Sequence, residues 1–136
     1  MTLSDIKKEI IGWKFTSYKL INISIGVLAL LIYEFIARPI YRPYIYANRI
    51  NDFHIADTIG NSLGTLATVF IFIGLLTSEL LQGKYLMRII ILGLVLYETA
   101  HPLLGKTIDI WDIIATLVTG VLSYLLFICL FRKKAM

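Results

Sequence analysis

Four apolar stretches dominate this sequence, and each is long enough to cross a bilayer as an α-helix. They are expected at about residues 19–38, 55–80, 85–102 and 110–131. Because a helix rises about 1.5 Å per residue, roughly twenty residues span the hydrocarbon layer. Hydrophobic residues make up 58% of the 136 residues, more apolar surface than a soluble domain of this size can bury. We therefore predict an all-α integral membrane four-helix bundle that forms a single domain over residues 1–136.

Prolines and short polar segments separate the predicted spans. Pro39 is expected to end the first span and Pro102 the third, because proline removes a helix hydrogen bond. The connection before the fourth span is short, so the third and fourth spans should form an antiparallel helical hairpin.

The segment ahead of the first span, residues 1–18, has a different pattern. Ile6, Ile10 and Trp13 recur at helical spacing, while lysines occupy the other positions. We expect an amphipathic helix here that lies in the membrane interface and anchors the chain.

Basic residues are distributed unevenly between the two predicted sides of the membrane. The side with both termini carries nine basic and three acidic residues, and the other side carries four basic and six acidic residues. Because basic residues favour the cytoplasmic side, this asymmetry predicts a plasma-membrane protein with both termini inside. Basic residues that flank spans are ordinary membrane anchors, so no nucleic-acid partner is expected.

The two halves of the sequence resemble each other. The segment Tyr33 to Pro39 (YEFIARP) matches the segment Tyr97 to Pro102 (YETAHP), with one residue dropped. In each half an acidic residue then opens the next span, followed by a small polar residue and a glycine. These sets are Asp57, Asn61 and Gly64 in the first half, and Asp112, Thr116 and Gly120 in the second. The pattern indicates two related hairpins, a parallel internal repeat whose polar ends meet on the outer side.

The polar residues of this outer side are the candidates for a functional site, because charged side chains at a membrane boundary are costly. The catalytic candidates are Glu98, His101, Asp109 and Asp112. The ligand-binding candidates are Glu34, Arg38, Arg42, His54, Asp57, Asn61 and Lys106.

Several roles for these residues are open. Glu98 and His101 are spaced to act as an acid–base pair in a hydrolase or transferase of lipid phosphates. They also suit the binding of a lipid headgroup without turnover, beside the tyrosines and arginines of the loop 39–54. In a third alternative Asp57 and Asp112 only cap helices, Glu34 pairs with Arg38, and the cluster clasps two hairpins together.

Metal and cysteine chemistry receive little support from the sequence. The histidines lack an HExxH pair or other close spacing, so we predict neither a metal nor a cofactor. The single cysteine, Cys129, lies inside the last apolar stretch and excludes a disulfide framework. Membrane lipids are the expected partners. A homo-oligomer or a second membrane protein is an alternative, through a GxxxG step at Gly60 and Gly64.

The second half of the chain also resembles a known family. The motif Glu98-x-x-His101, the segment Gly105 to Asp112 (GKTIDIWD) and Gly120 are similar to the signature of the VanZ-like bacterial membrane proteins. That signature has Glu-x-x-Gln, a Gly-Arg turn, Asp-x-x-Asp, then Asn and Gly. His101, Lys106 and Thr116 depart from it, and the match covers about a fifth of the chain. The resemblance implies a cell-envelope protein related to glycopeptide resistance, with no settled biochemical activity.

We therefore expect a VanZ-like envelope protein whose outer polar cluster binds or senses a lipid headgroup or lipid-linked ligand. A lipid-phosphate hydrolase or transferase and a scaffold without a site are the alternatives.

Overall fold

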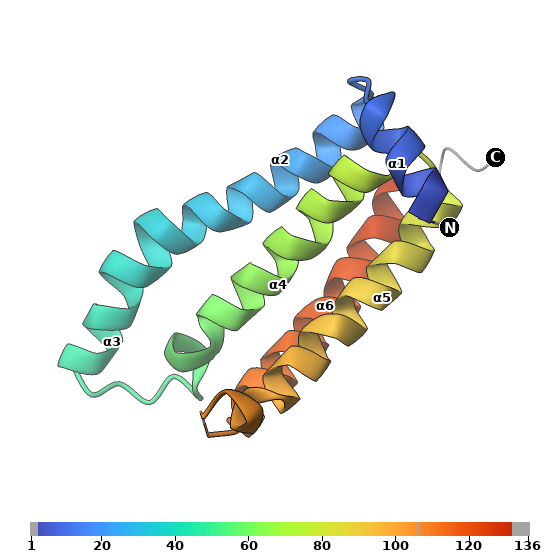
Figure 1. Ribbon diagram of the computed structural model, residues 1–136. Helices are drawn as coiled ribbons and strands as arrows, with labels where there is room; N and C mark the ends of the chain where they lie inside the picture. The colour runs from blue at the N-terminus through green and yellow to red at the C-terminus, as the bar shows by residue number, and fades with distance from the viewer. Residues whose placement is uncertain (1–2, 106, 132–136) are drawn as a thin grey trace.

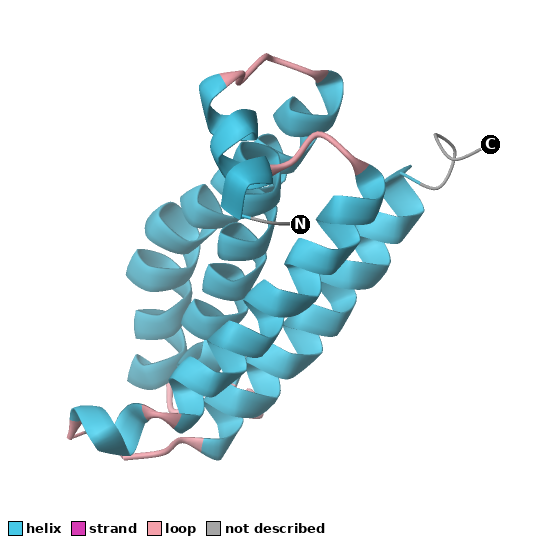
Figure 2. Cartoon of the chain, turned by 45° about the vertical axis from the view of Figure 1, so that its right-hand side comes forward, coloured by secondary structure: helices cyan, strands magenta, loops and turns pink. Residues whose placement is uncertain are grey.

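The computed structural model describes residues 3–105 and 107–131, and these residues form helices joined by short loops (Figures 1 and 2). The elements are α1 (Leu3–Ile11), α2 (Ser17–Ile32), the π-helix η1 (Tyr33–Tyr41), α3 (Arg42–Ala47), α4 (Ile55–Leu76), α5 (Leu80–Thr99), the 3₁₀-helix η2 (His101–Leu104) and α6 (Ile110–Phe131).

Four helical segments are long and apolar enough to cross a membrane, as predicted. They are Ser17–Ala47, Ile55–Leu76, Leu80–Thr99 and Ile110–Phe131. Large apolar side chains remain exposed along them, such as those of Phe35 and Leu92. In water such exposure would be unfavourable, whereas lipid solvates it. The chain is a membrane protein with an all-α bundle fold.

The four segments alternate in direction, so both ends of the described chain lie at one end of the bundle (Figure 1). We call this end, which carries α1, residues 77–79 and Phe131, the N-terminal end. The opposite end carries residues 33–57, 97–105 and 107–112, and we call it the acidic end (Figure 1). Glu34 and Glu98 therefore belong to the same end of the molecule.

Glycines allow α2 to pack closely along α4, which lies at the centre of the bundle. A Cβ atom on Gly26 would lie 2.5 Å from the Ile71 side chain and 2.9 Å from the Ala67 carbonyl oxygen. A Cβ on Gly74 would lie 2.6 Å from the Ile23 side chain. Membrane helices associate largely through such backbone approach, because apolar burial gives little driving force in lipid.

The largest cluster of buried side chains lies toward the N-terminal end. It contains Tyr18, Val69, Phe70, Ile73, Leu86, Met87, Phe127 and Phe131. The rings of Tyr18 and Phe131 lie 4.8 Å apart and join α2 to α6. Because this apolar cluster lies toward the N-terminal end, contacts between polar side chains are the ones that join the elements of the acidic end.

The prediction that Pro39 ends the first span is wrong. Helical structure continues through the π-helix η1, which contains Pro39, into α3 (Figure 1). The Arg42 N–H donates to the carbonyl of Ala37, five residues back, so the wider π-turn accommodates a residue that α-helical bonding would exclude. The expected outer loop 39–54 is consequently helical up to Ala47, and the connecting loop begins at Asn48.

The second connection also differs from its predicted position. Helix α4 ends at Leu76 and α5 begins at Leu80, whereas breaks at residues 80 and 85 were expected. Thr77 adopts an extended conformation, and its hydroxyl oxygen accepts a hydrogen bond from the Glu79 N–H at 3.1 Å. This local bond competes with helix continuation in a way that apolar periodicity does not reveal.

The amphipathic helix α1 is present and shorter than predicted, because it ends at Ile11 and leaves Trp13 in the following loop. Lys19 is one of the basic residues that flank the first span, but its side chain does not face the lipid headgroups. Its side chain is 1% exposed, and its Nζ lies 2.8 Å from Glu9 Oε1. The Ser78 hydroxyl donates to the same carboxylate. Glu9 thus ties α1 to α2 and to the loop between α4 and α5.

Candidate functional site

Asp52 organises the entry into α4. Its carboxylate accepts hydrogen bonds from the Ala56 N–H at 2.7 Å and from the Tyr41 hydroxyl at 2.9 Å. The first bond caps α4, and the second fixes the end of η1 against it. Asp52 therefore has a structural role. Its position in the sequence alone does not distinguish this role from a role in a functional site.

Asp57 and His54 connect three elements of the acidic end. Asp57 accepts a hydrogen bond from the Tyr46 hydroxyl of α3 at 2.6 Å, and its other oxygen lies 3.2 Å from His54 Nδ1. The His54 ring stacks on Trp111 of α6, with 4.7 Å between ring centroids. Half of each of the Asp57 and His54 side chains is exposed, so this group remains accessible.

Asp57 and Asp112 lie in the first turns of α4 and α6, as predicted, where their charges complement the helix dipoles, but the recorded hydrogen bonds to N–H groups there involve other carboxylates. The caps at the starts of α4 and α6 come from Asp52 and from Asp109, whose Oδ1 accepts the Trp111 N–H at 2.8 Å. Asp52 stands five residues before Asp57 and Asp109 three residues before Asp112, so each capping side chain reaches the first N–H groups from the loop that precedes the helix. Asp57 and Asp112 are left for other interactions.

Arg42 brings positive charge into this end. Its guanidinium lies 5.9 Å from the Tyr46 ring and donates to the Tyr46 hydroxyl at 3.4 Å. Its Nε is buried, with no hydrogen-bond partner among the described residues. The charge of Arg42 acts on both Asp57 and Asp112, which lie on different hairpins. Arg42 is therefore close enough to both halves of the acidic end for its charge to influence each of them.

Glu98 and His101 form the least exposed ionisable pair of this end. His101 Nε2 lies 3.4 Å from Glu98 Oε2, and the two side chains are 14% and 11% exposed. The Tyr97 ring meets the His101 ring edge to face at 5.2 Å. The i,i+3 spacing continues across the end of α5 into η2 and brings together the two residues that the sequence offered, as one alternative, for an acid–base pair.

A cavity of about 170 Å³ lies between α4, α5 and α6 beside this pair. Its polar wall includes Glu98, Asn61 and Thr116, the last of which is buried. Gly64 opens onto it, since nothing lies within 4 Å of a Cβ built there. The sequence-related residues Asn61 and Thr116 thus line one cavity. Uncharged hydrogen-bonding groups and a carboxylate in such a space suit a ligand that donates hydrogen bonds.

Other predicted site residues lie elsewhere. Glu34 and Arg38 form the predicted ion pair at 3.2 Å, and both are at least half exposed on η1, without a recorded contact to the Glu98 cavity among the described residues. Lys106 lies outside the described residues. Within residues 3–105 and 107–131, no group of three or more His, Cys, Asp or Glu side chains is placed to hold a metal ion.

Sequence reasoning missed the aromatic contribution to this end. The tyrosines of the loop 39–54 were expected beside a lipid headgroup, whereas Tyr41 and Tyr46 donate hydrogen bonds to Asp52 and Asp57. Trp111 was not selected, and it stacks on His54. Each tyrosine precedes its aspartate by eleven residues, a repeated spacing that is visible in the sequence.

Comparisons with known proteins give no relatives: no protein-family model matches this chain, and no curated protein or solved structure matches it at a significant level.

Proposed function

We propose that the acidic end binds the polar head of a lipid or lipid-linked molecule, in a VanZ-like protein of the bacterial cell envelope. The observation that carries this proposal is the Glu98–His101 pair, which lies beside a cavity that Asn61 and Thr116 also line. An ionisable side chain in a membrane helix is costly and is retained mainly where it has a function. N-terminal capping does not account for Glu98, because it lies in the last turn of α5, where carbonyl groups and not N–H groups are free.

The charges indicate the chemistry of the ligand. Glu98 and Asn61 provide oxygen acceptors for a hydroxyl or amine group, and the Arg42 guanidinium is suited to a phosphate. A phospholipid headgroup with an amine or hydroxyl combines both features. In this proposal the acidic end faces the outer leaflet, since the opposite end carries the excess of basic residues.

A second candidate function is proton transfer to a bound lipid phosphate. It is favoured by the contact of His101 Nε2 with Glu98 Oε2 at 3.4 Å, because a carboxylate that orients an imidazole supports general acid–base catalysis. Release of phosphate or alcohol from a short-chain phosphatidic acid by the purified protein would support this candidate. The scaffold alternative receives less support at its predicted seam, because Gly60 faces the Tyr33 ring and Gly64 faces the cavity between α4, α5 and α6.

Binding of two zwitterionic lipids tests the main proposal. Dihexanoyl phosphatidylethanolamine has N–H donors, whereas dihexanoyl phosphatidylcholine has none, so calorimetric titration of the purified protein should show a preference for the former. Glu98→Gln should reduce this preference by roughly tenfold, the size expected for losing a hydrogen bond to a charged acceptor. Glu34→Gln, which removes an exposed carboxylate of the same end, is the matched control and should leave binding unchanged. Equal binding of both lipids, or equal binding by Glu98→Gln and the wild type, would overturn the proposal.

A further inference from the structure

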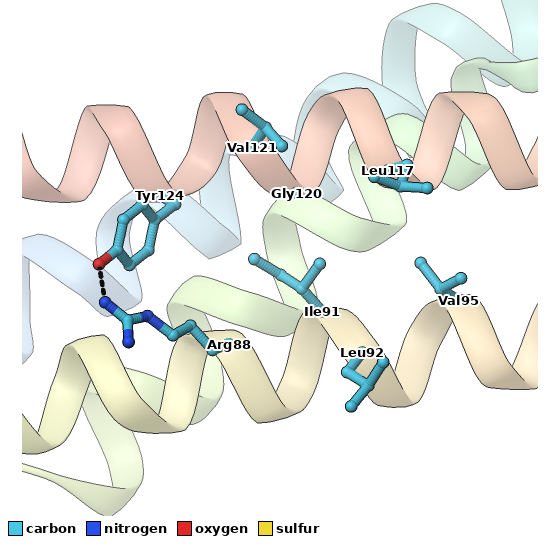
Figure 3. A pocket seen from close by; sticks show the side chains of 8 residues that line it. All are labelled: Arg88, Ile91, Leu92, Val95, Leu117, Gly120, Val121 and Tyr124. Atoms are coloured by element: carbon cyan, nitrogen blue, oxygen red, sulfur yellow. Dashed lines mark hydrogen bonds between the residues drawn. The ribbon is translucent and has the colours of Figure 1, made fainter.

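A groove on the outer surface of α5 and α6 is separate from the acidic end. It has a volume of about 360 Å³ and is almost entirely apolar over its length. Its walls are Ile91, Leu92, Val95, Leu117, Gly120 and Val121 (Figure 3). The groove exists because Gly120 has no side chain: a Cβ there would lie 2.6 Å from the Ile91 side chain, so the two helices approach closely beneath it.

Arg88 and Tyr124 close one end of this groove (Figure 3). Arg88 Nη2 donates to the Tyr124 hydroxyl at 2.6 Å, and the guanidinium carbon lies 5.3 Å from the Tyr124 ring centroid. The guanidinium has five N–H donors, and this is the hydrogen bond recorded for it within the described residues. Arg88 is exposed and lies eight residues into α5, about 12 Å along the helix from Leu80. A charge at this depth requires an anionic or hydrated partner.

A second, more polar depression shares Arg88 and extends toward the N-terminal end. It has a volume of about 350 Å³, and its walls are Leu81, Gln82, Lys84, Tyr85 and Arg88. Lys84 and Arg88 are one helical turn apart and therefore lie on the same face of α5. The surface thus has two cations and polar groups at one end and an apolar channel at the other, which is the polarity of a single lipid molecule.

We propose that this surface, the Arg88 groove, binds one anionic phospholipid of the leaflet at the N-terminal end. The phosphate contacts Arg88 and Lys84, and an acyl chain lies between α5 and α6 along Leu92 and Val121. Arginine suits this role because its planar guanidinium presents paired donors to a phosphate. Tyr124 holds the guanidinium at the mouth of the channel.

Charge decides between a lipid and a second copy of this chain. The segments 84–95 and 117–124 contain Lys84 and Arg88 and no acidic residue. A twofold dimer through this face, with its axis along the membrane normal, would bring Arg88 of one copy to the same depth as Arg88 of the other. Like charges would then meet in a low-dielectric medium, which is unfavourable. An anionic lipid supplies the opposite charge.

Native mass spectrometry of the purified full chain, with dioleoyl phosphatidylglycerol and dioleoyl phosphatidylcholine in competition, tests this proposal. We expect one phosphatidylglycerol to be retained preferentially, and Arg88→Gln and Lys84→Gln each to reduce the preference by about fivefold, as expected for about 1 kcal/mol per basic residue. Arg88→Lys should keep most of it. Lys8→Gln, at an exposed position of α1, is the control for general surface charge and should have no effect.

Two tryptophan substitutions test the acyl channel. Val121→Trp fills the groove and should reduce lipid retention, whereas Leu122→Trp, at a neighbouring exposed position outside it, should not. The proposal would be overturned if the preference for phosphatidylglycerol were unchanged in both Arg88→Gln and Val121→Trp. It would also be overturned if the wild type were a dimer and either variant dissociated that dimer. Glu98→Gln should leave the preference for phosphatidylglycerol unchanged. The experiments can therefore reject the proposal for the acidic end and the proposal for the Arg88 groove independently.

Discussion

Lys19 Nζ lies 2.8 Å from Glu9 Oε1, although the Lys19 side chain is 1% exposed and belongs to a membrane helix. Its ammonium group also lies 5.2 Å from the centroid of the Trp13 ring. The pair joins the surface helix α1 to α2, so the amphipathic segment is part of the folded structure as well as a membrane anchor.

Glu9→Ala should therefore destabilise the protein by about 3 kcal/mol, because it leaves the Lys19 charge buried without its partner. The value is at the low end for buried pairs because the Glu9 side chain is 30% exposed. Thermal unfolding in detergent, followed by tryptophan fluorescence, measures the effect. The double variant Glu9→Ala/Lys19→Met should recover most of the loss, and a single variant as stable as the wild type would contradict this account.

The same pair predicts a dependence of stability on pH. Hydrogen bonds from Lys19 and Ser78 hold the pKa of the Glu9 carboxyl below its ordinary value of 4.5. A lowered pKa in the folded state means that the stabilisation is complete above pH 4.5 and is lost as the pH falls through the folded-state pKa. The unfolding temperature of the wild type should therefore approach that of Glu9→Ala below pH 4.5. A constant difference between the two down to the lowest accessible pH would argue against the assignment.

The fold was largely predictable, because four long apolar stretches leave few alternatives to a helical bundle in lipid. The errors lie where a local bond competes with apolar periodicity. The π-helix carries the chain past Pro39, and the Thr77 hydroxyl bond ends α4 early. The pairing of Lys19 with Glu9 was not predictable either, since it depends on how α1 folds back.

The candidate site was predictable only in part. The contact of Glu98 with His101 agrees with their i,i+3 spacing, and Asn61 and Thr116 line one cavity in agreement with their matched positions. The sequence does not distinguish capping acids from others, because whether a carboxylate meets a free N–H group depends on the conformation of the loop before the helix. Thus Asp52 and Asp109 are caps, while Asp57 bonds to Tyr46.

Gly26 and Gly74 set the distance between α2 and α4. Gly26→Ala and Gly74→Ala should each destabilise the protein by about 1–3 kcal/mol, because their Cβ atoms would overlap with Ile71 and Ile23 and with backbone atoms of the facing helix. Gly93→Ala is the matched control, since nothing lies within 4 Å of its added Cβ. Chemical or thermal unfolding of the three variants checks this, and equal stabilities would mean that the close approach is unimportant.

Arg49 ends α3 in a conformation that normally selects glycine. Its φ is 52°, and the bonds from the Ile50 N–H to the Ile45 carbonyl and from the Arg49 N–H to the Tyr46 carbonyl complete a Schellman motif. Arg49→Gly should thus raise the free energy of unfolding by about 1 kcal/mol. Arg49→Ala keeps the strained backbone conformation and should give no such gain. The difference between the unfolding curves of the two variants therefore measures the free energy of the backbone strain. A loss of stability in Arg49→Gly would show that the arginine side chain contributes more than its backbone costs.

The proposed orientation is open to direct labelling. In a Cys129→Ser background, Phe53→Cys lies at the acidic end and Ile11→Cys at the N-terminal end, and both positions are highly exposed. A membrane-impermeant maleimide should label Phe53→Cys in intact cells and Ile11→Cys only after permeabilisation. The reverse pattern would place the acidic end in the cytoplasm.

The central claim is that the cavity at the acidic end receives a ligand, and filling it is the most direct test. Gly64→Leu places a side chain in the cavity at a position where nothing lies within 4 Å of the added Cβ, and Gly93→Leu adds the same side chain at an equally open position outside the cavity. Binding of dihexanoyl phosphatidylethanolamine should be lost in Gly64→Leu and kept in Gly93→Leu, with both variants as stable as the wild type in the absence of lipid. Undiminished binding by a folded Gly64→Leu variant would contradict the account.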